Sequence, residues 1–245
     1  MTASHTFASS VGPLLFSFAV LTVPAMAVPP PVESFDGVTI RCTPGASATT
    51  VLICRDAALR RFDDEVRRLF TLVRTDPSLP SSTRASLLSE QRLWVEQRQA
   101  CWQSAKPPTW DADLRRCVLE STLVRLHLLR QISASARRED PASISQGPIP
   151  VACPEIRDVL RVTLVNGQPE FAVVESNGRL VLLTRTPSAS GVRYVSSTTS
   201  SNPSNDAAAP SALLWIKGEQ VQIEWPTLGL SAANCRFQPV TGPHP

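Results

Sequence analysis

The chain has 245 residues, of which 42% are hydrophobic and 18% are charged, and its formal net charge at pH 7 is +3. This length allows two small domains, or one domain with tails. Beyond residue 27 no stretch approaches the ~18 consecutive apolar residues of a membrane-spanning helix, and three histidines without any CxxC spacing do not favour a metal site.

The chain begins with a predicted export signal. Residues 11–23 form an apolar run that is short for a membrane span, and the Ala-Met-Ala of residues 25–27 has the small-x-small pattern of a signal-peptidase site. The leader lacks Lys and Arg, so an N-terminal anchor helix is the alternative. Position 28 is valine, so no cysteine is available there for a lipid anchor. We therefore expect removal of residues 1–27 and a soluble periplasmic or secreted protein without stable membrane insertion.

All six cysteines follow the predicted leader, and an even number in an exported chain indicates disulfides. Their connectivity is open from the count alone, because six cysteines can pair in many ways. We expect neighbours along the chain to pair, which gives Cys42–Cys54, Cys101–Cys117 and Cys153–Cys235.

A proline-rich linker at residues 28–40 precedes a helical region at residues 41–133. Its apolar residues recur at steps of three and four, as on one face of a helix. The first stripe consists of Leu59, Phe62, Val66, Leu69, Phe70 and Val73. After a break at residues 76–82, a second helix contains Leu87, Leu88, Trp94 and Val95. A third helix, which Asp111 can cap, contains Leu114, Cys117, Val118 and Leu128.

The spacing of the apolar residues changes after a second linker at residues 134–149, which is rich in small and polar residues and contains prolines. From residue 150 to 239, short apolar runs alternate with turn signals. Asn-Gly pairs at 166–167 and 177–178 separate such runs and are strong hairpin signals. The pattern predicts a small antiparallel barrel or sandwich, followed by a tail at residues 240–245. The predicted fold class is α+β in two domains, a small disulfide-stapled helical domain and then a small antiparallel β-barrel.

Positive charge is concentrated in the helical region. Residues 41–138 hold 17 Lys and Arg against 10 Asp and Glu, whereas residues 150–245 hold seven of each. A basic helical face favours weak contact with anionic envelope polymers, or is simply solvated. We expect no nucleic-acid partner and no cofactor.

The helical region resembles the N-terminal domain of LprI-type lysozyme inhibitors. The matching segments are CTPGASATTVLIC (42–54), DAALRRFDDEVRRLF (56–70) and SEQRLWVEQRQAC (89–101), followed by Cys117. The run Gln-Arg-x-Trp-x-x-x-Arg-x-x-Cys is the most specific part, and the similarity covers residues 38–133. Within it we expect Trp94 on the buried stripe and Arg98 as a structural ion-pair partner.

The strand region resembles the C-type lysozyme inhibitor family, called MliC when membrane-anchored and PliC when periplasmic. Its first motif, Ser-Gly-x-x-Tyr, is matched by Ser190, Gly191 and Tyr194. Its second motif, Trp-x-Lys-Gly, is matched by Trp215, Lys217 and Gly218. Cys153 and Cys235 occupy the positions of the family's bridging pair. The two motifs occur in order inside a cysteine-bracketed strand region, so together they are more specific than either alone.

The resemblance implies an eight-stranded antiparallel barrel that inserts loops into the active cleft of a C-type lysozyme, where the motif Ser and Lys meet the catalytic carboxyl groups. A hydroxyl can form a hydrogen bond with a carboxyl group in either protonation state, whereas an ammonium group pairs with the ionised form. Gly191 permits a tight turn, and Tyr194 would hold the loop by packing and by its phenol. The predicted partner-binding residues are Ser190, Gly191, Arg193, Tyr194, Lys217 and Gly218. For Arg193, which lies beside the first motif, the alternative is a solvated side chain without contact to the partner.

Two features depart from the family's pattern. Tyr194 and Trp215 are separated by a tract of 20 residues rich in Ser, Asn, Ala and Pro. This tract is longer than expected, which puts the placement of Lys217 in doubt more than that of Ser190. The protein is also not acidic, so it lacks long-range attraction for a cationic enzyme.

Two other functions compete with inhibition. Ser190 as a catalytic nucleophile would need a base, but the only histidine of the strand region is His244 in the tail, and nothing orients Lys217 for that role. A non-catalytic envelope-binding or structural module would instead use the basic helical region to hold anionic wall polymers. The resemblance favours an inhibitor without enzymatic activity over both.

Overall fold

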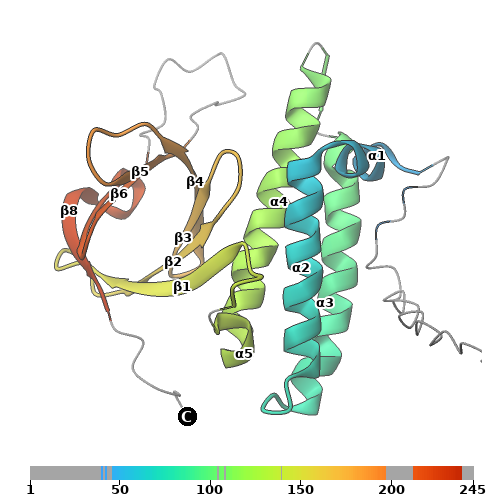
Figure 1. The fold of residues 1–245 in the computed structure, drawn as a ribbon, viewed down its shortest axis with the longest axis horizontal. Helices are drawn as coiled ribbons and strands as arrows, with labels where there is room; N and C mark the ends of the chain where they lie inside the picture. Colours follow the sequence, from blue (N-terminus) through green and yellow to red (C-terminus); the bar gives the residue numbers. More distant parts are fainter. Residues whose placement is uncertain are drawn as a thin grey trace, which may run out of the picture. The chain divides into compact units, whose positions relative to one another are not determined.

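The computed structural model describes residues 40, 42, 46–103, 105–107, 109–138, 140–196 and 212–238. Helices come first and strands second, which confirms the α+β fold class (Figure 1). The predicted leader, most of the first linker and the tail lie outside the described residues. Within the described ranges, every helix falls short of the length and hydrophobicity that a membrane span requires.

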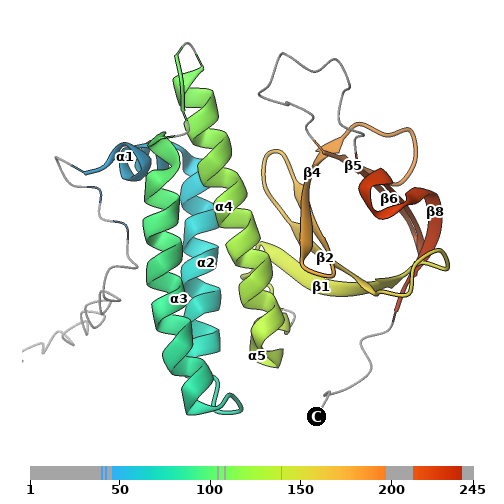
Figure 2. The ribbon, with the colours of Figure 1, turned by 180° about the vertical axis from the view of Figure 1, so that it is seen from behind.

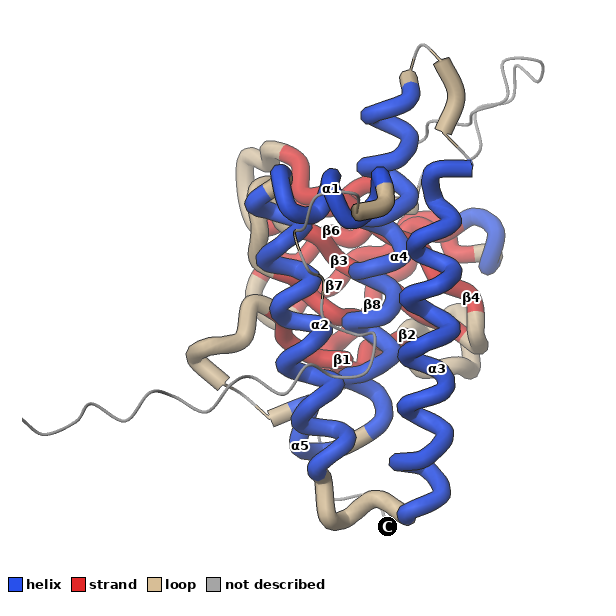
Figure 3. Tube along the Cα trace, turned by 90° about the vertical axis from the view of Figure 1, so that its right-hand side faces the viewer, coloured by secondary structure: helices blue, strands red, loops and turns tan. Residues whose placement is uncertain are grey.

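Three long helices and several short ones make up the helical region. Their bounds are α1 Ala48–Arg55, α2 Ala57–Thr75, α3 Ser81–Gln99, the 3-10 helix η1 Ala100–Gln103, α4 Trp110–Ile132 and α5 Ala134–Arg137. The long helices α2, α3 and α4 lie side by side (Figures 1, 2 and 3). Asp111 lies in the first turn of α4 rather than at its cap, because Thr109 occupies the N-cap position.

The predicted apolar stripes form the core of the helical region. Every residue of the first stripe is at most 1% exposed, although Leu128 of the third stripe is 38% exposed. Arg98 is fully buried, its Nη1 lies 2.5 Å from Asp63 Oδ1, and its guanidinium carbon lies 4.1 Å from the centroid of the Trp94 ring. Trp94 and Arg98 therefore have the structural roles expected of them. The disulfides Cys42–Cys54 and Cys101–Cys117 staple this region.

Eight strands close into an antiparallel barrel in sequence order, so the barrel prediction is confirmed and the sandwich is not formed (Figure 2). The strands are β1 Ser145–Ala152, β2 Leu160–Val165, β3 Phe171–Ser176, β4 Arg179–Thr186, β5 Val192–Val195, β6 Leu213–Lys217, β7 Gln220–Trp225 and β8 Leu230–Phe237. The third disulfide, Cys153–Cys235, lies where β1 pairs with β8 and so ties the first strand to the last.

One of the two predicted hairpin turns is tight and the other is not. Asn177 and Gly178 both have positive φ, 49° and 78°, and connect β3 to β4 directly. The Asn166-Gly167 pair instead begins a longer loop, because Val165 pairs with Phe171 and the intervening residues stay outside the ladder. The Asn166 N–H donates to the Ile144 carbonyl at 2.7 Å, so the chain continues along the sheet before it turns.

Residues 134–149, which were expected to form a linker, contain α5 and the first residues of β1. Arg130, only 1% exposed, donates to the hydroxyls of Ser143 and Ser145, each at 2.7 Å. The same two hydroxyls donate to Glu65 Oε1 at 2.6 and 2.7 Å. Burial lowers the pKa of Arg130 to about 10, which leaves its guanidinium charged at pH 7. Ser143 and Ser145 are therefore partners of a buried charge rather than part of a solvated linker.

The helical core continues into one side of the barrel. Phe62 of α2 meets Phe171 of β3 edge-on, with ring centroids 5.8 Å apart, and Val165 and Val173 belong to the same buried cluster. His127 of α4 is fully buried, and its Nδ1 lies 2.8 Å from Thr163 Oγ1. The helical region and the barrel accordingly belong to one compact unit.

Candidate functional site

The strand register places the two motif turns side by side. In the β5–β6 ladder Val192 pairs with Ile216, so the turn before β5 and the turn after β6 lie at the same end of the barrel. A Cβ added to Gly191 would lie 3.2 Å from the Lys217 Cβ, which shows how closely the turns approach. Ser190 and Lys217 are therefore brought together although 27 positions separate them in the chain.

Gly191 is required by two independent features of this turn. Its φ is +69°, in the left-handed region that favours glycine. A Cβ at this position would also lie 2.4 Å from the Ile216 carbonyl oxygen, a distance that only a shift of the backbone could relieve. Gly218 has a φ of +59° as well, but open space surrounds the position of its missing Cβ.

Trp215 connects the two turns. Its indole Nε1 donates to the Ser190 carbonyl at 2.9 Å, and the Ser188 hydroxyl donates to the same oxygen at 2.8 Å. The Lys217 ammonium lies 6.0 Å from the centroid of the same indole. Trp215 matched the second motif, but its role between the turns was not predicted, because no residue pattern indicates a hydrogen bond to a backbone oxygen.

Two polar side-chain groups, a hydroxyl and an ammonium group, are exposed at this end of the barrel. Ser190 and Lys217 are both exposed. Within the described part of the chain, the Ser190 hydroxyl has no hydrogen-bond partner and the Lys217 ammonium has no ion pair. A hydroxyl and an ammonium group on adjacent turns can engage two neighbouring carboxyl groups of another molecule.

The other predicted site residues occupy different surroundings. Tyr194 is only 4% exposed and pairs with Leu214, so its ring belongs to the barrel core. Its phenol oxygen lies 3.5 Å from Glu170 Oε2, and burial together with the Glu170 charge raises its pKa. Arg193 is exposed on β5, opposite Trp215 in the ladder. Tyr194 is thus part of the barrel core, whereas the Arg193 side chain is exposed beside the turn.

The long tract between the motifs does not disturb the register of β6. Val195 pairs with Leu213, the Ser196 N–H donates to the Ala212 carbonyl at 2.9 Å, and the Ala212 N–H donates to the Ser196 hydroxyl at 2.9 Å. The tract therefore leaves and re-enters the barrel at neighbouring positions, at the opposite end of β5 from the Ser190 turn. Residues 197–211 lie outside the described residues.

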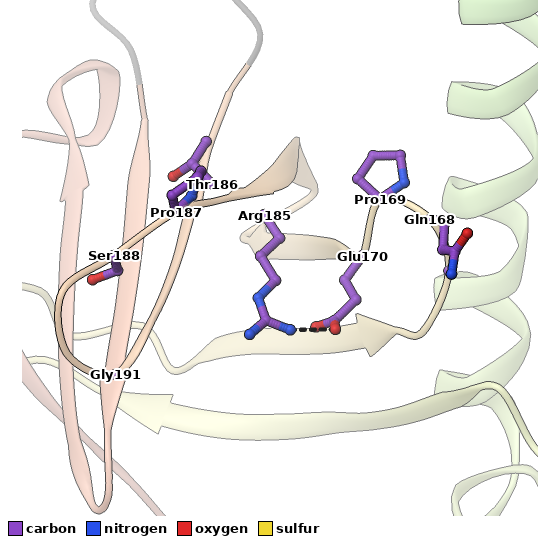
Figure 4. A pocket seen from close by; sticks show the side chains of 9 residues that line it. Gln168, Pro169, Glu170, Arg185, Thr186, Pro187, Ser188 and Gly191 are labelled. Carbon is purple, nitrogen blue, oxygen red and sulfur yellow. Dashed lines mark hydrogen bonds and ion pairs between the residues drawn. The ribbon is translucent and has the colours of Figure 1, made fainter.

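A groove of about 540 Å³ adjoins the Ser190 turn (Figure 4). It is lined by Gly167, Gln168, Pro169, Glu170, Arg185, Thr186, Pro187, Ser188 and Gly191. Arg185 and Glu170 form an ion pair between its two walls, and the Arg185 N–H donates to the Glu170 carbonyl at 2.9 Å. Neither residue was expected at the site, since each is an ordinary charged residue next to a strand end in the sequence.

The described residues provide no constellation for metal or nucleophilic chemistry. Among them, no group of three His, Cys, Asp or Glu side chains is arranged to hold a metal ion. No base is hydrogen-bonded to Ser190 in the same part of the chain, and His127 lies away from it, against Thr163 of β2. What these residues present is a pair of polar turns with an adjoining groove.

Comparison with known proteins supports the barrel resemblance. Residues 151–229 match the family model described as membrane-bound lysozyme-inhibitor of c-type lysozyme, MliC. No curated protein and no solved structure matches the chain. The match begins at the end of β1, contains β2 to β7 and both motif turns, and stops just before β8, so it covers less than half of the chain. The family it identifies is one of lysozyme inhibitors rather than enzymes, and the likeness of the helical region to LprI-type domains stays a prediction.

Proposed function

We propose that this protein inhibits c-type lysozyme by inserting the Ser190 and Lys217 turns into the active cleft of the enzyme. The observation that carries this proposal is the β5–β6 register, which brings two exposed turns of different chemistry to one end of the barrel. The family match over residues 151–229 supports the identity of the partner.

The two turns suit the catalytic groups of such an enzyme. A retaining glycosidase of this kind has two carboxyl groups about 5 Å apart, one protonated and one ionised. The Ser190 hydroxyl can donate to or accept from either group, whereas the Lys217 ammonium pairs with the ionised one. Occupation of both carboxyl groups excludes the saccharide. Arg193, exposed beside the turn, adds a further contact with the enzyme, and Gly191 and Gly218 contribute by the backbone shapes they allow.

The proposal is tested by titrating the full-length protein into a lysozyme cell-wall lysis assay. Loss of the charged contact in Lys217→Ala should weaken inhibition about 10- to 150-fold, and Ser190→Ala about 2- to 12-fold, because hydrogen bonds to charged groups contribute more than neutral ones. Lys106→Ala and Ser231→Ala, both at exposed positions outside the two turns, are the matched controls. If all four variants inhibit equally, the turns do not enter the cleft.

A second candidate function, contact with anionic wall polymers, rests on the surplus of basic residues in the helical region. It predicts that the protein sediments with purified cell wall at low salt and is released as salt screens the charges. Sedimentation without any inhibition of lysozyme would favour this function over the first.

A further inference from the structure

The groove beside the Ser190 turn has two walls of different origin. One wall is the β4–β5 turn itself, contributed by residues 186–188 and Gly191. The other is the β2–β3 loop, in which Gln168 and Pro169 are exposed. Figure 4 shows the Arg185 and Glu170 side chains meeting between these walls. Because Ser188 and Gly191 belong to the turn that carries Ser190, a protein that covers Ser190 lies directly beside the groove.

The wall formed by the β2–β3 loop rests on the helical region. A Cβ added to Gly167 would lie 2.7 Å from Cζ and 3.0 Å from Cε1 of Phe62, so the loop backbone is in close contact with that ring. Phe62 is 1% exposed and also packs edge-on against Phe171, the residue with which β3 begins. One side chain of α2 therefore contacts both the loop and the start of the strand that follows it.

The floor of the groove is polar and accessible. The side chains of Glu170 and Arg185 are 31% and 45% exposed, and both can form hydrogen bonds to a protein lying over them. Glu170 is also the residue that Tyr194 reaches from inside the barrel, at 3.5 Å. The groove consequently shares Ser188 and Gly191 with the Ser190 turn, and its Glu170 lies near Tyr194 of β5, the strand that follows this turn.

We propose that this groove is a second contact surface for the lysozyme, taking a segment that borders the active cleft, and that Phe62 is the positioning residue for its far wall. The inference rests on the proposed function. On this proposal the helical region takes part in inhibition, because α2 holds the β2–β3 loop at a fixed distance from the Ser190 turn. The enzyme surface fits the two walls at that distance. Phe62 itself, being buried, does not touch the enzyme.

Two sets of variants of the full-length protein test this inference, with affinity for a hen-type c-type lysozyme as the readout. Gln168→Trp fills the groove from an exposed position and should weaken binding about tenfold or more, the size of effect seen at central interface positions. Its control, Thr227→Trp, places the same bulk on an exposed residue of the 3-10 helix η2, Pro226–Leu228, at the opposite end of the strands.

The positioning role is tested by Phe62→Leu and Gly167→Ala, which perturb one contact from its two sides. Each should weaken binding about threefold or more, while Phe70→Leu, an equally buried Phe on α2, should lower only thermal stability. The double variant Phe62→Leu/Gly167→Ala should bind better than the product of the single effects predicts, by about twofold or more, because the smaller leucine makes room for the added methyl group. A purely structural role of Phe62 would give no such rescue.

The outcomes separate this inference from the function on which it rests. Wild-type protein that does not bind lysozyme would overturn both. Wild-type protein that binds, with Gln168→Trp unchanged, would overturn the second contact surface alone. Binding by Gly167→Ala equal to that of wild type would overturn the positioning role of Phe62, even if Phe62→Leu does not fold.

Discussion

Replacing Gly191 by alanine should damage both stability and inhibition, for reasons that can be separated. An L-residue in the left-handed region costs about 1–2 kcal/mol, and the φ of Gly191 is +69°. The new Cβ would also lie 2.4 Å from the Ile216 carbonyl oxygen, so the turn must move away from β6. That movement strains or breaks the hydrogen bond from Trp215 to the Ser190 carbonyl, worth about 0.5–1.5 kcal/mol.

The two costs together amount to about 1.5–3.5 kcal/mol, or roughly 3–14 °C in Tm for a chain of this size. Gly178→Ala is the matched control: its φ is +78°, nothing lies within 4 Å of the added Cβ, and it sits in the β3–β4 turn at the other end of the barrel. The control carries the conformational cost alone. Gly191→Ala should therefore lose more Tm than Gly178→Ala.

Inhibition distinguishes the two variants more sharply than stability. Moving the Ser190 turn away from the Lys217 turn should weaken inhibition about tenfold, the effect of ~1.4 kcal/mol of lost contact, whereas Gly178→Ala should inhibit like the wild type. Thermal unfolding and lysis inhibition, measured on the same preparations, provide both quantities. If Gly191→Ala matches Gly178→Ala in Tm and in inhibition, the close packing of the two turns has no functional role.

Three further predictions concern stability. Burial lowers the pKa of His127 from 6.5 to about 4, so His127 of the unfolded chain is protonated first as the pH falls. The free energy of unfolding should therefore drop by up to about 3 kcal/mol between pH 6.5 and 4. In denaturant titrations, the free energy of unfolding of His127→Gln should depend less on pH, and an unchanged dependence would assign the effect to other groups. Arg130→Met removes the buried charged partner of Ser143 and Ser145 and should lower the free energy of unfolding by about 3–5 kcal/mol. Arg138→Met, at an exposed position, should lower it little. Equal losses of stability in the two variants would contradict the structural importance of the buried cluster. Replacing both Cys153 and Cys235 by serine should cost on the order of 4 kcal/mol in chemical denaturation, and a loss below about 1 kcal/mol would show that β1 and β8 hold together without the bridge.

Features with a regular repeat were predictable from the sequence. The spacing of Leu59, Phe62 and Val66 by three and four residues gives a buried helical face directly, and these residues are buried in α2. Neighbouring cysteines form the three disulfides, and Asn177-Gly178 makes the tight turn that its two positive φ angles demand.

Features that depend on distant partners were not predictable in this way. Helix α1 contacts the end of α3, where Gln99 Nε2 donates to the Thr50 hydroxyl at 3.1 Å across 49 positions of the chain. Ser143 and Ser145 indicate a linker by composition, and only the buried Arg130 gives them structural partners. The same holds for the groove, because Glu170 and Arg185 become neighbours through the pairing of β3 with β4.

Within the site, the position of Lys217 relative to Ser190 is likewise a feature that depends on pairing between distant residues. The tract of 20 residues between Tyr194 and Trp215 made the position of Lys217 uncertain from the sequence. The ladder resolves the question, because Val195 and Leu213 pair at the base of the tract and fix the register of the whole of β6. Length along the chain is therefore a poor guide to the distance between the two turns.

The most direct test of cleft occupation is the mode of inhibition of a c-type lysozyme by the full-length protein, measured with a soluble oligosaccharide substrate. If the Ser190 and Lys217 turns occupy the catalytic carboxyl groups, substrate and inhibitor exclude one another. The apparent inhibition constant should then rise in proportion to the substrate concentration above KM, with kcat unchanged at saturating substrate. An inhibition constant that stays the same at every substrate concentration, with a lowered kcat, would place the binding site outside the cleft and contradict the proposed mechanism.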